Sequence, residues 1–246
     1  MASHFARWIP PQTHTGRLSS ELIAHSQTLP ERRRGRWLAA RALLAELLFH
    51  VYGINKLPAL TTSAAGRPCF LDNELPDFSI AYAGNMIGVL LAEENGKAGL
   101  DMEIVRAHSR QTLEHHHQHF TSAERAWINA QSDPAEAATQ IWTLRQSILK
   151  LTDNDAQMRD RALQLHPASG RLRAMNQPNL QAICDAEPLL VWSCAFSPET
   201  DKLRLWEYQG DSLWQELRNI PLRQQSMGPR ALRLTSVTAE KNISMM

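Results

Sequence analysis

The amino-acid sequence predicts an α+β fold. Short stretches of alternating apolar residues, typical of β-strands, lie among separate stretches in which apolar residues recur at helical spacing. No segment of about 20 to 50 residues repeats, which excludes a solenoid or a propeller. The chain has 246 residues, 43% of them hydrophobic, so it can bury a core without disulfides.

The first clear element is a helix from Gly35 to Val51, where apolar residues recur every three or four positions. Two loops rich in small and turn-forming residues follow, at Thr61–Pro68 and Asp72–Asp77. Three strands come next in the prediction, and they cover Phe78–Tyr82, Met86–Ala92 and Gly99–Val105. The turn Asn95-Gly96 between the last two is typical of a hairpin.

Two further helices are predicted from their start signals. Thr121 and Glu124 have the spacing of a capping box, and Asp133 precedes Pro134, a residue favoured in the first helical turn. The second of these helices is expected to end near Thr152, before a turn.

The last third of the chain has weaker signals. Strands are expected at Leu189–Phe196 and Leu203–Tyr208, between Pro and Gly breaks. The residues after Pro221 show no clear periodicity and are expected to fray.

Composition excludes several classes of protein. Lys and Arg number 26 and Asp and Glu 25, so the net charge of +1 gives no general field for nucleic acid or an anionic membrane. The three cysteines match neither a zinc ribbon nor a redox pair, which favours a reducing compartment. The first ten residues lack a signal-peptide pattern and no apolar run is long enough to span a bilayer, so a cytoplasmic protein is expected.

Two acidic residues lie two positions apart in the strand expected at Gly99–Val105. Side chains alternate along a strand, so Asp101 and Glu103 share one face. Carboxylates placed this way can both reach one hard cation such as Mg²⁺. From the spacing alone, the solvated outer face of an edge strand is the commoner explanation.

Four motifs around this pair carry a family resemblance. They are Gly66-Arg67-Pro68, the strand from Phe78 to Gly84, Gly99-Leu100-Asp101-Met102-Glu103, and Trp142-Thr143-Leu144-Arg145-Gln146 followed by Lys150. Their order resembles that of the 4′-phosphopantetheinyl transferase superfamily, closest to the bacterial carrier-protein synthases of the Sfp/AcpT type. The resemblance spans about residues 33 to 152 and includes an arginine-bearing helix with Arg34, Arg36 and Arg41.

The resemblance implies both a fold and a reaction. The fold would have two similar halves about a pseudo-twofold axis, here residues 1–105 and 106–220, with 221–246 as a flexible tail. The reaction would transfer 4′-phosphopantetheine from coenzyme A, bound between the halves, to a serine of an apo acyl or peptidyl carrier protein. The other product would be 3′,5′-ADP, and the enzyme would be a monomer that uses Mg²⁺.

The resemblance also implies roles for individual residues. Asp101 and Glu103 would bind Mg²⁺, and the catalytic set would be Glu103, Gln146 and Lys150. Coenzyme A would be bound by basic and phenolic side chains, namely Arg36, Arg41, Arg67, Tyr82 and Lys150. The alternatives are an ordinary surface arginine for Arg41 and a solvated helix-end lysine for Lys150.

The chain departs from the family pattern at several of these positions. Gln146 stands where the family has a glutamate, and an amide cannot take the proton of a serine. Glu103, Glu124 or a metal-bound water could replace it, although Glu124 also fits a capping box. Ala81 and Tyr82 stand for Ser-His, Ser79 for Asn and Arg145 for Lys. These changes leave open a second function, a degenerate module that binds coenzyme A or a carrier protein without transfer.

A run of histidines lies between the strand and the later helices. His115 and His119 are one helical turn apart, as metal ligands can be, but only Glu114 adds a further ligand at suitable spacing. Solvated histidines are the preferred explanation, and a histidine-based metal protein is a third, weaker alternative.

Overall fold

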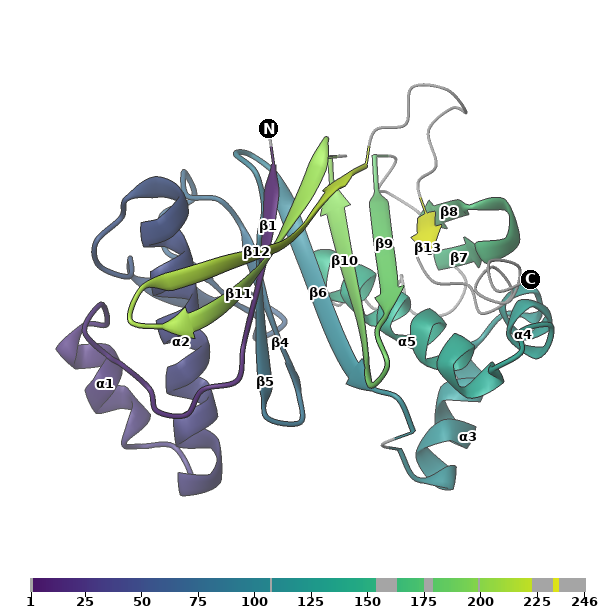
Figure 1. Cartoon of the computed structure of the whole chain (residues 1–246), viewed down its shortest axis with the longest axis horizontal. Helices are drawn as coiled ribbons and strands as arrows, with labels where there is room; N and C mark the ends of the chain where they lie inside the picture. Colours follow the sequence, from purple (N-terminus) through teal and green to yellow (C-terminus); the bar gives the residue numbers. More distant parts are fainter. Residues whose placement is uncertain are drawn as a thin grey trace.

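Two β-sheets, each backed by one long helix, form the centre of the protein (Figure 1). This computed structural model describes residues 2–106, 108–153, 163–174, 179–198, 200–222 and, for the backbone, 232–234. The helices in these ranges are α1 (Ser20–Ser26), α2 (Glu31–Tyr52), α3 (Arg110–His119), α4 (Ser122–Asn129) and α5 (Pro134–Leu151). Together with the strands, they confirm the predicted α+β class.

The first sheet has the order β12-β11-β1-β5-β4. Its strands are β1 (Ser3–Trp8), β4 (Phe78–Ala83), β5 (Met86–Leu91), β11 (Lys202–Gly210) and β12 (Leu213–Pro221). β1 lies in the middle, antiparallel to β5 and parallel to β11, with Phe5 opposite Leu90 on one side and Leu205 on the other. The first strand of the chain thus lies beside a strand about 200 residues later in the sequence.

The second sheet has the order β13-β9-β10-β6. Its strands are β6 (Lys97–Ile104), β9 (Gln181–Ala186), β10 (Leu190–Ser197) and β13 (Leu232–Leu234). β6 is an edge strand, and its register with β10 places Asp101 opposite Ser193 and Glu103 opposite Val191. Each sheet contains strands from before residue 105 and strands from after it. A division of the protein into halves at that residue stays a prediction.

Two short hairpins complete the strands. β2 (Leu60–Thr62) pairs with β3 (Pro68–Phe70), and β7 (Leu163–His166) pairs with β8 (Arg171–Ala174) across a 3₁₀ turn, η2 (Pro167–Ser169). The segment Thr61–Pro68, expected to be a loop, is therefore the tip of a hairpin. Polar and small residues conceal strands this short, because they bury little on either face.

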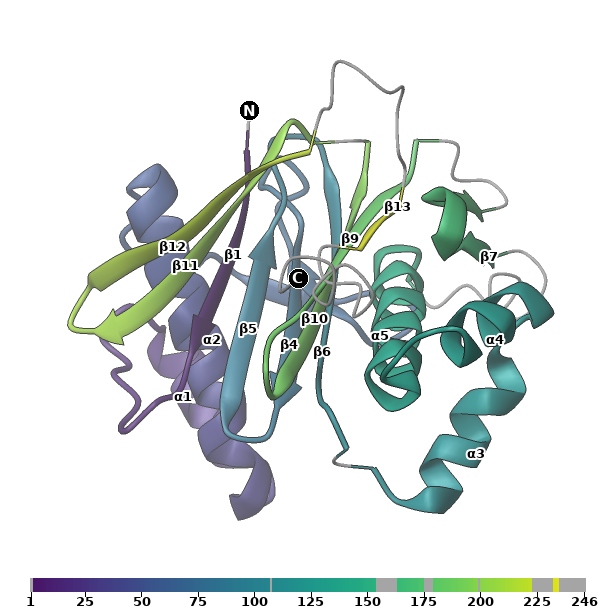
Figure 2. The same ribbon diagram turned by 45° about the vertical axis from the view of Figure 1, so that its right-hand side comes forward.

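The sheets and helices pack in four layers, which Figure 2 shows from a second side. α2 covers the outer face of the first sheet, and α5 covers the outer face of the second. The inner faces meet in a third cluster, in which Phe5 contacts Trp192 with ring centroids 5.3 Å apart. This burial of apolar surface is the main stabilising term of the fold.

Most of the predicted helices and strands are present, with shifted ends. The helix expected at Gly35–Val51 is α2, which begins earlier, at Glu31. The prediction missed its first turn because those residues are charged and mostly exposed and have no apolar repeat. Both predicted helix starts are confirmed, with Thr121 and Asp133 as the N-cap residues. Beyond Pro221, Leu222 is buried in the inner cluster, residues 232–234 form β13, and the other residues of the expected tail lie outside the described ranges. None of the helices in the described ranges is long and apolar enough to cross a membrane.

Gly99 sets the distance between α5 and the second sheet. A Cβ atom at this position would lie 1.9 Å from the carbonyl oxygen of Ser147 and 2.8 Å from the backbone nitrogen of Leu151. Only glycine permits this approach of a helix to a strand. The last turn of α5 therefore lies directly against the part of β6 that carries Asp101.

Candidate active site at the edge of the second sheet

Asp101 is buried on β6, with a relative exposure of 8%. Its Oδ1 accepts a hydrogen bond from Nζ of Lys150 at 3.0 Å, and the same Nζ donates to the carbonyl oxygen of Leu100 at 2.8 Å. Its Oδ2 is buried and has no hydrogen-bond partner among the described residues. Burial raises the pKa of Asp101, while the charge of Lys150 opposes the rise. Lys150 lies in the last turn of α5, as its alternative has it, but its Nζ is bound to Asp101 rather than to solvent alone.

Glu103 lies two residues further along the same strand face. Its Oε2 is 2.9 Å from Nε2 of His108, in the segment that follows the strand. Burial raises the pKa of Glu103, and the nearby charge of Asp101 raises it further. A cation bound between these two carboxylates would stabilise their charged forms, which burial and mutual repulsion disfavour.

These carboxylates fit a hard divalent cation. The unpartnered Oδ2 of Asp101 is an oxygen ligand that the described residues leave unused, and Glu103 supplies further oxygens next to it. Over the described ranges, no group of three or more His, Cys, Asp and Glu side chains could hold a metal by itself. An ion here would need further ligands from water and from substrate phosphates, which is how Mg²⁺ is usually bound.

One face of α5 points towards this strand. Trp142, Gln146 and Lys150 are spaced four residues apart and so lie on one side of the helix. Lys150 contacts Asp101 at the end of the row, and Trp142 stacks on His116 at its beginning, with ring centroids 3.6 Å apart. Gln146, half-buried, lies between them on the same face. An amide thus occupies the place of the family glutamate.

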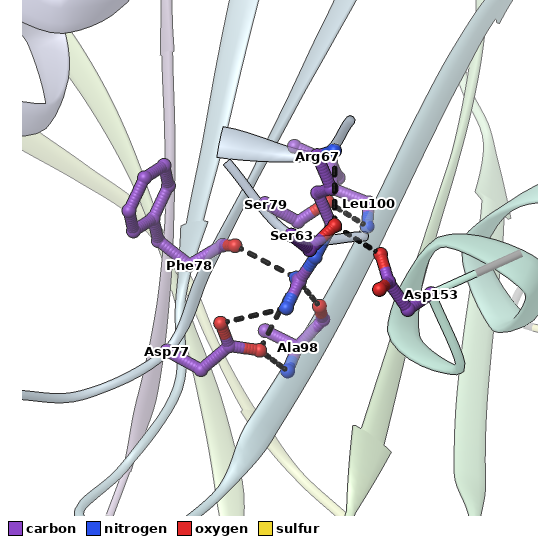
Figure 3. Close-up of polar contacts among 8 residues, drawn as sticks. All are labelled: Ser63, Arg67, Asp77, Phe78, Ser79, Ala98, Leu100 and Asp153. Atoms are coloured by element: carbon purple, nitrogen blue, oxygen red, sulfur yellow. Dashed lines mark hydrogen bonds and ion pairs between the residues drawn. The ribbon is translucent and has the colours of Figure 1, made fainter. Parts of the chain in front are cut away.

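Arg67 is held inside the protein rather than pointing into open space (Figure 3). Its guanidinium donates to both carboxylate oxygens of Asp77, at 2.9 and 3.2 Å, and to the carbonyl oxygens of Phe78 and Ala98 at 3.0 and 3.2 Å. Asp77 in turn accepts from the backbone nitrogen of Ala98 at 3.0 Å. This set of bonds fixes the start of β6 against the start of β4.

Two serines extend these contacts. Ser79 Oγ accepts from the backbone nitrogen of Leu100 at 2.9 Å, so β4 also contacts β6 next to Asp101. Ser63 Oγ donates to Oδ1 of Asp153 at 2.5 Å and accepts from the backbone nitrogen of Arg67. The tip of the β2–β3 hairpin is therefore joined to the end of α5 (Figure 3).

Arg36, Arg41 and Tyr82 form a second cluster. The guanidinium of Arg41 lies 3.8 Å from the ring centroid of Trp37, and that of Arg36 lies 5.2 Å from the ring of Tyr82. Arg41 is 8% exposed, so it is not the ordinary surface arginine of the alternative. Burial lowers the pKa of Arg41 and raises that of Tyr82, and the electrostatic interaction between the two side chains opposes both shifts. Two guanidinium groups and one phenol thus lie in the same cluster.

A pocket of about 590 Å³ opens beside Arg41. Trp37, His25 and residues of the β2–β3 hairpin line it, and Arg41 forms part of its wall. Nε of Arg41 is buried without a hydrogen-bond partner among the described residues. The pocket thus combines an aromatic surface with a buried cation.

Glu124 takes no part in this site. It is fully buried, its Oε1 accepts from Arg145 at 2.7 Å, and its Oε2 accepts from the backbone nitrogen of Thr121 at 2.8 Å. The capping box is therefore confirmed, and both oxygens of Glu124 are engaged inside the core. It cannot reach the serine of a partner protein.

The histidine run lies on α3 and is only partly solvated. His115 and His117 are exposed, but His116 is buried, and burial lowers its pKa to about 4. The expectation of solvated histidines is wrong for His116, because its ring stacks on Trp142. His108 was not predicted as a site residue, and its only signal in the sequence is its place five residues after Glu103.

Comparison with known proteins identifies the family. A family model described as the 4′-phosphopantetheinyl transferase superfamily matches residues 97–195. The chain is 44% identical to the uncharacterized protein YieE of Escherichia coli K12 over 250 residues, 99% of each chain. It is 31% identical to the 4′-phosphopantetheinyl transferase AcpT of Escherichia coli O157:H7 over 120 residues, which are 48% of this chain and 57% of that protein. The resemblance found in the motifs is confirmed: residues 97–195 of this chain carry a 4′-phosphopantetheinyl transferase superfamily domain.

Proposed function

We propose that this protein transfers 4′-phosphopantetheine from coenzyme A to a serine of an apo acyl or peptidyl carrier protein. The observation that carries the proposal is the group of buried Asp101 and half-buried Glu103 and Lys150, in which one oxygen of Asp101 has no hydrogen-bond partner among the described residues. A diphosphate needs both a cation and a positive side chain, and this group offers ligands for the first and supplies the second. Family membership supports the same reaction.

Asp101 and Glu103 would hold Mg²⁺, which when bound neutralises charge on the diphosphate under attack. Lys150 would donate to a phosphate oxygen, since its Nζ already lies at the carboxylate group. Arg41, Arg36 and Tyr82 would bind the 3′-phosphate, because a buried guanidinium with a free Nε suits a phosphate oxygen. The adjacent pocket would take the adenosine.

Arg67 stands apart from this set. The resemblance implies that it binds coenzyme A, but Asp77 and two carbonyl groups already engage its guanidinium. We propose that its chief contribution is to fix β6, and hence Asp101, against β4.

In the reaction, the serine oxygen of the carrier forms a bond to the phosphorus next to the pantetheine. The bond from that phosphorus to the bridging oxygen breaks, and 3′,5′-ADP leaves with the electron pair. The serine proton must pass to a base, for which Glu103 is the carboxylate at the site, while Gln146 can only orient an oxygen by its amide.

The fold supports the family arrangement of two similar halves. One long helix backs each of the two sheets, and the sheets face each other across an apolar layer. We propose that the halves are related by a pseudo-twofold axis and that the protein acts as a monomer.

Gln146 favours a second candidate function. Without the family glutamate, the chain could bind coenzyme A or a carrier protein and transfer nothing. Both candidates require coenzyme A binding, and only the first requires a covalent product.

Incubation with coenzyme A, MgCl₂ and a panel of apo carrier proteins tests the proposal, with the mass of the carrier as the measurement. The transferase predicts a mass increase on serine for at least one carrier and none with Asp101→Asn. Coenzyme A binding by calorimetry without any mass gain across the panel would favour the binding module. If the protein shows no coenzyme A binding and no carrier gains mass, both candidate functions are contradicted.

A further inference from the structure

His108 contacts a carboxylate of the candidate site directly. Its Nε2 lies 2.9 Å from Oε2 of Glu103, and both side chains are 23% exposed, so solvent competes little for this contact. A carboxylate oxygen only accepts hydrogen bonds, so the imidazole nitrogen is the donor. One oxygen of Glu103 is thereby fixed in place.

A row of aromatic rings from α5 and α3 ends at His108. Its ring lies 5.1 Å from that of His116 with the planes at 73°, and His116 stacks on Trp142 of α5 at 3.6 Å with the planes at 10°. The buried ring of His116 thus bridges the helix that carries Gln146 and Lys150 and the segment that carries His108. This packing limits the positions that the imidazole of His108 can take.

We propose that His108 is a positioning residue for the cation site: it holds Oε2 of Glu103 by a hydrogen bond and so orients Oε1 beside the unpartnered Oδ2 of Asp101. The inference rests on the proposed function, since it concerns the same site. It also assigns a role to His116, the buried histidine of the run, which is to support His108 rather than to bind metal.

The need for such a residue follows from position 146. The amide of Gln146 adds no charge to the site, so the cation depends on two carboxylates, Asp101 and Glu103. Asp101 is already oriented by Lys150, and His108 does the same for Glu103. Loss of an outer hydrogen bond to a ligand typically lowers metal affinity about 10- to 100-fold.

The experiment uses Mn²⁺ as a spectroscopic probe of the full-length protein with coenzyme A present, and free Mn²⁺ is counted by its electron paramagnetic resonance signal. His108→Met removes the donor and keeps side-chain volume, whereas His108→Gln keeps an N–H donor. His117→Met, on the exposed face of α3, is the matched control. Thermal unfolding of each variant checks the fold.

The expected result is an affinity about 10- to 100-fold lower for His108→Met. His108→Gln should restore most of it, and His117→Met should match the wild type. A wild-type protein that binds Mn²⁺ and a folded His108→Met variant that binds it equally well would overturn the inference alone. A wild-type protein that binds neither Mn²⁺ nor Mg²⁺ would overturn the proposed function, and the inference with it.

Electron spin echo spectroscopy of the bound Mn²⁺ separates positioning from direct ligation. A positioning role predicts no directly coordinated nitrogen in the wild type. A strong ¹⁴N coupling that His108→Met removes would show that His108 is itself a ligand, which contradicts the inference. If His108→Met does not fold, the Gln variant and this spectrum still decide between the two.

Discussion

The guanidinium of Arg67 meets the carboxylate of Asp77 end-on, with Nη1 and Nη2 each donating to one of the two oxygens. This geometry is the strongest form of a carboxylate and arginine pair, because two parallel hydrogen bonds are made at once. The same guanidinium reaches β6 through the carbonyl oxygen of Ala98. An arginine of the Gly66-Arg67-Pro68 motif is therefore part of the frame of the site.

Arg67→Met should destabilise the protein and weaken the binding of coenzyme A and of dephospho-coenzyme A to the same extent. The reason is that the substitution disturbs β6 but removes no contact to the 3′-phosphate. Arg41→Met is the comparison: it should weaken coenzyme A binding about tenfold and leave dephospho-coenzyme A almost unaffected. Calorimetry with both ligands measures this ratio, and a selective loss of coenzyme A binding by Arg67→Met would contradict the assignment.

Gln146→Glu should raise transfer to a carrier protein about tenfold or more, because it restores a carboxylate beside the cation site and general-base catalysis is worth at least this much. The measurement is the initial rate of mass gain on the carrier. Gln118→Glu, on an exposed part of α3, adds the same charge elsewhere and should leave the rate unchanged. An equal or lower rate for Gln146→Glu would argue against a role for this position.

Glu124→Ala should lower the free energy of unfolding by about 3 to 5 kcal/mol, because it removes a carboxylate that forms an ion pair with the buried Arg145. Urea unfolding of Glu124→Ala, Arg145→Ala and the double variant measures the coupling. The double variant should be less destabilised than the sum of the single ones. Strict additivity would mean that the two side chains do not interact.

Stability should fall as the pH is lowered from about 6.5 to about 4. Burial, with a smaller effect from the charge of Arg204, lowers the pKa of His4 from 6.5 to about 4. In this range the unfolded chain binds a proton at His4 that the folded protein does not, so His4 alone contributes a loss of roughly 3 kcal/mol, to which the lowered pKa of His116 adds. Urea unfolding at several pH values measures it. His4→Gln keeps an acceptor for Trp206 and should flatten the slope, whereas His14→Gln, at an exposed site, should not.

Gly99→Ala should displace α5 and abolish cation and coenzyme A binding. The new methyl group would overlap the backbone of the helix, which moves Lys150 away from Asp101, and overpacking of this kind costs about 3 kcal/mol. Gly35→Ala is the control, since its Cβ would meet nothing within 4 Å and alanine favours the helix. Normal coenzyme A binding by Gly99→Ala would show that the close contact is dispensable.

Local signals predicted much of the fold. The capping box at Thr121 and the long apolar repeat of α2 act within a few residues, so they can be read from the sequence directly. β1 was missed because its residues are buried on both faces and alternate weakly. Its place in the middle of a sheet depends on β5 and β11, which are distant in sequence.

The candidate site divides in the same way. The shared face of Asp101 and Glu103 follows from strand alternation, so the sequence predicted it. Two other contacts depend on how segments fold back on each other: the hydrogen bond between Glu103 and His108, and the ion pair between Arg67 and Asp77. No spacing rule covers such contacts, and only the three-dimensional structure reveals them.

The parallel pairing of β1 with β11 joins residues 3–7 to residues 203–207. During synthesis, β1 can pair early with β5, but its second neighbour, β11, is made only after about 200 residues of the chain. Pairings of such long sequence separation form late and slowly. A nascent chain that stalls before β11 would expose an unpaired edge of β1, and we expect such chains to be targets for chaperones or proteases.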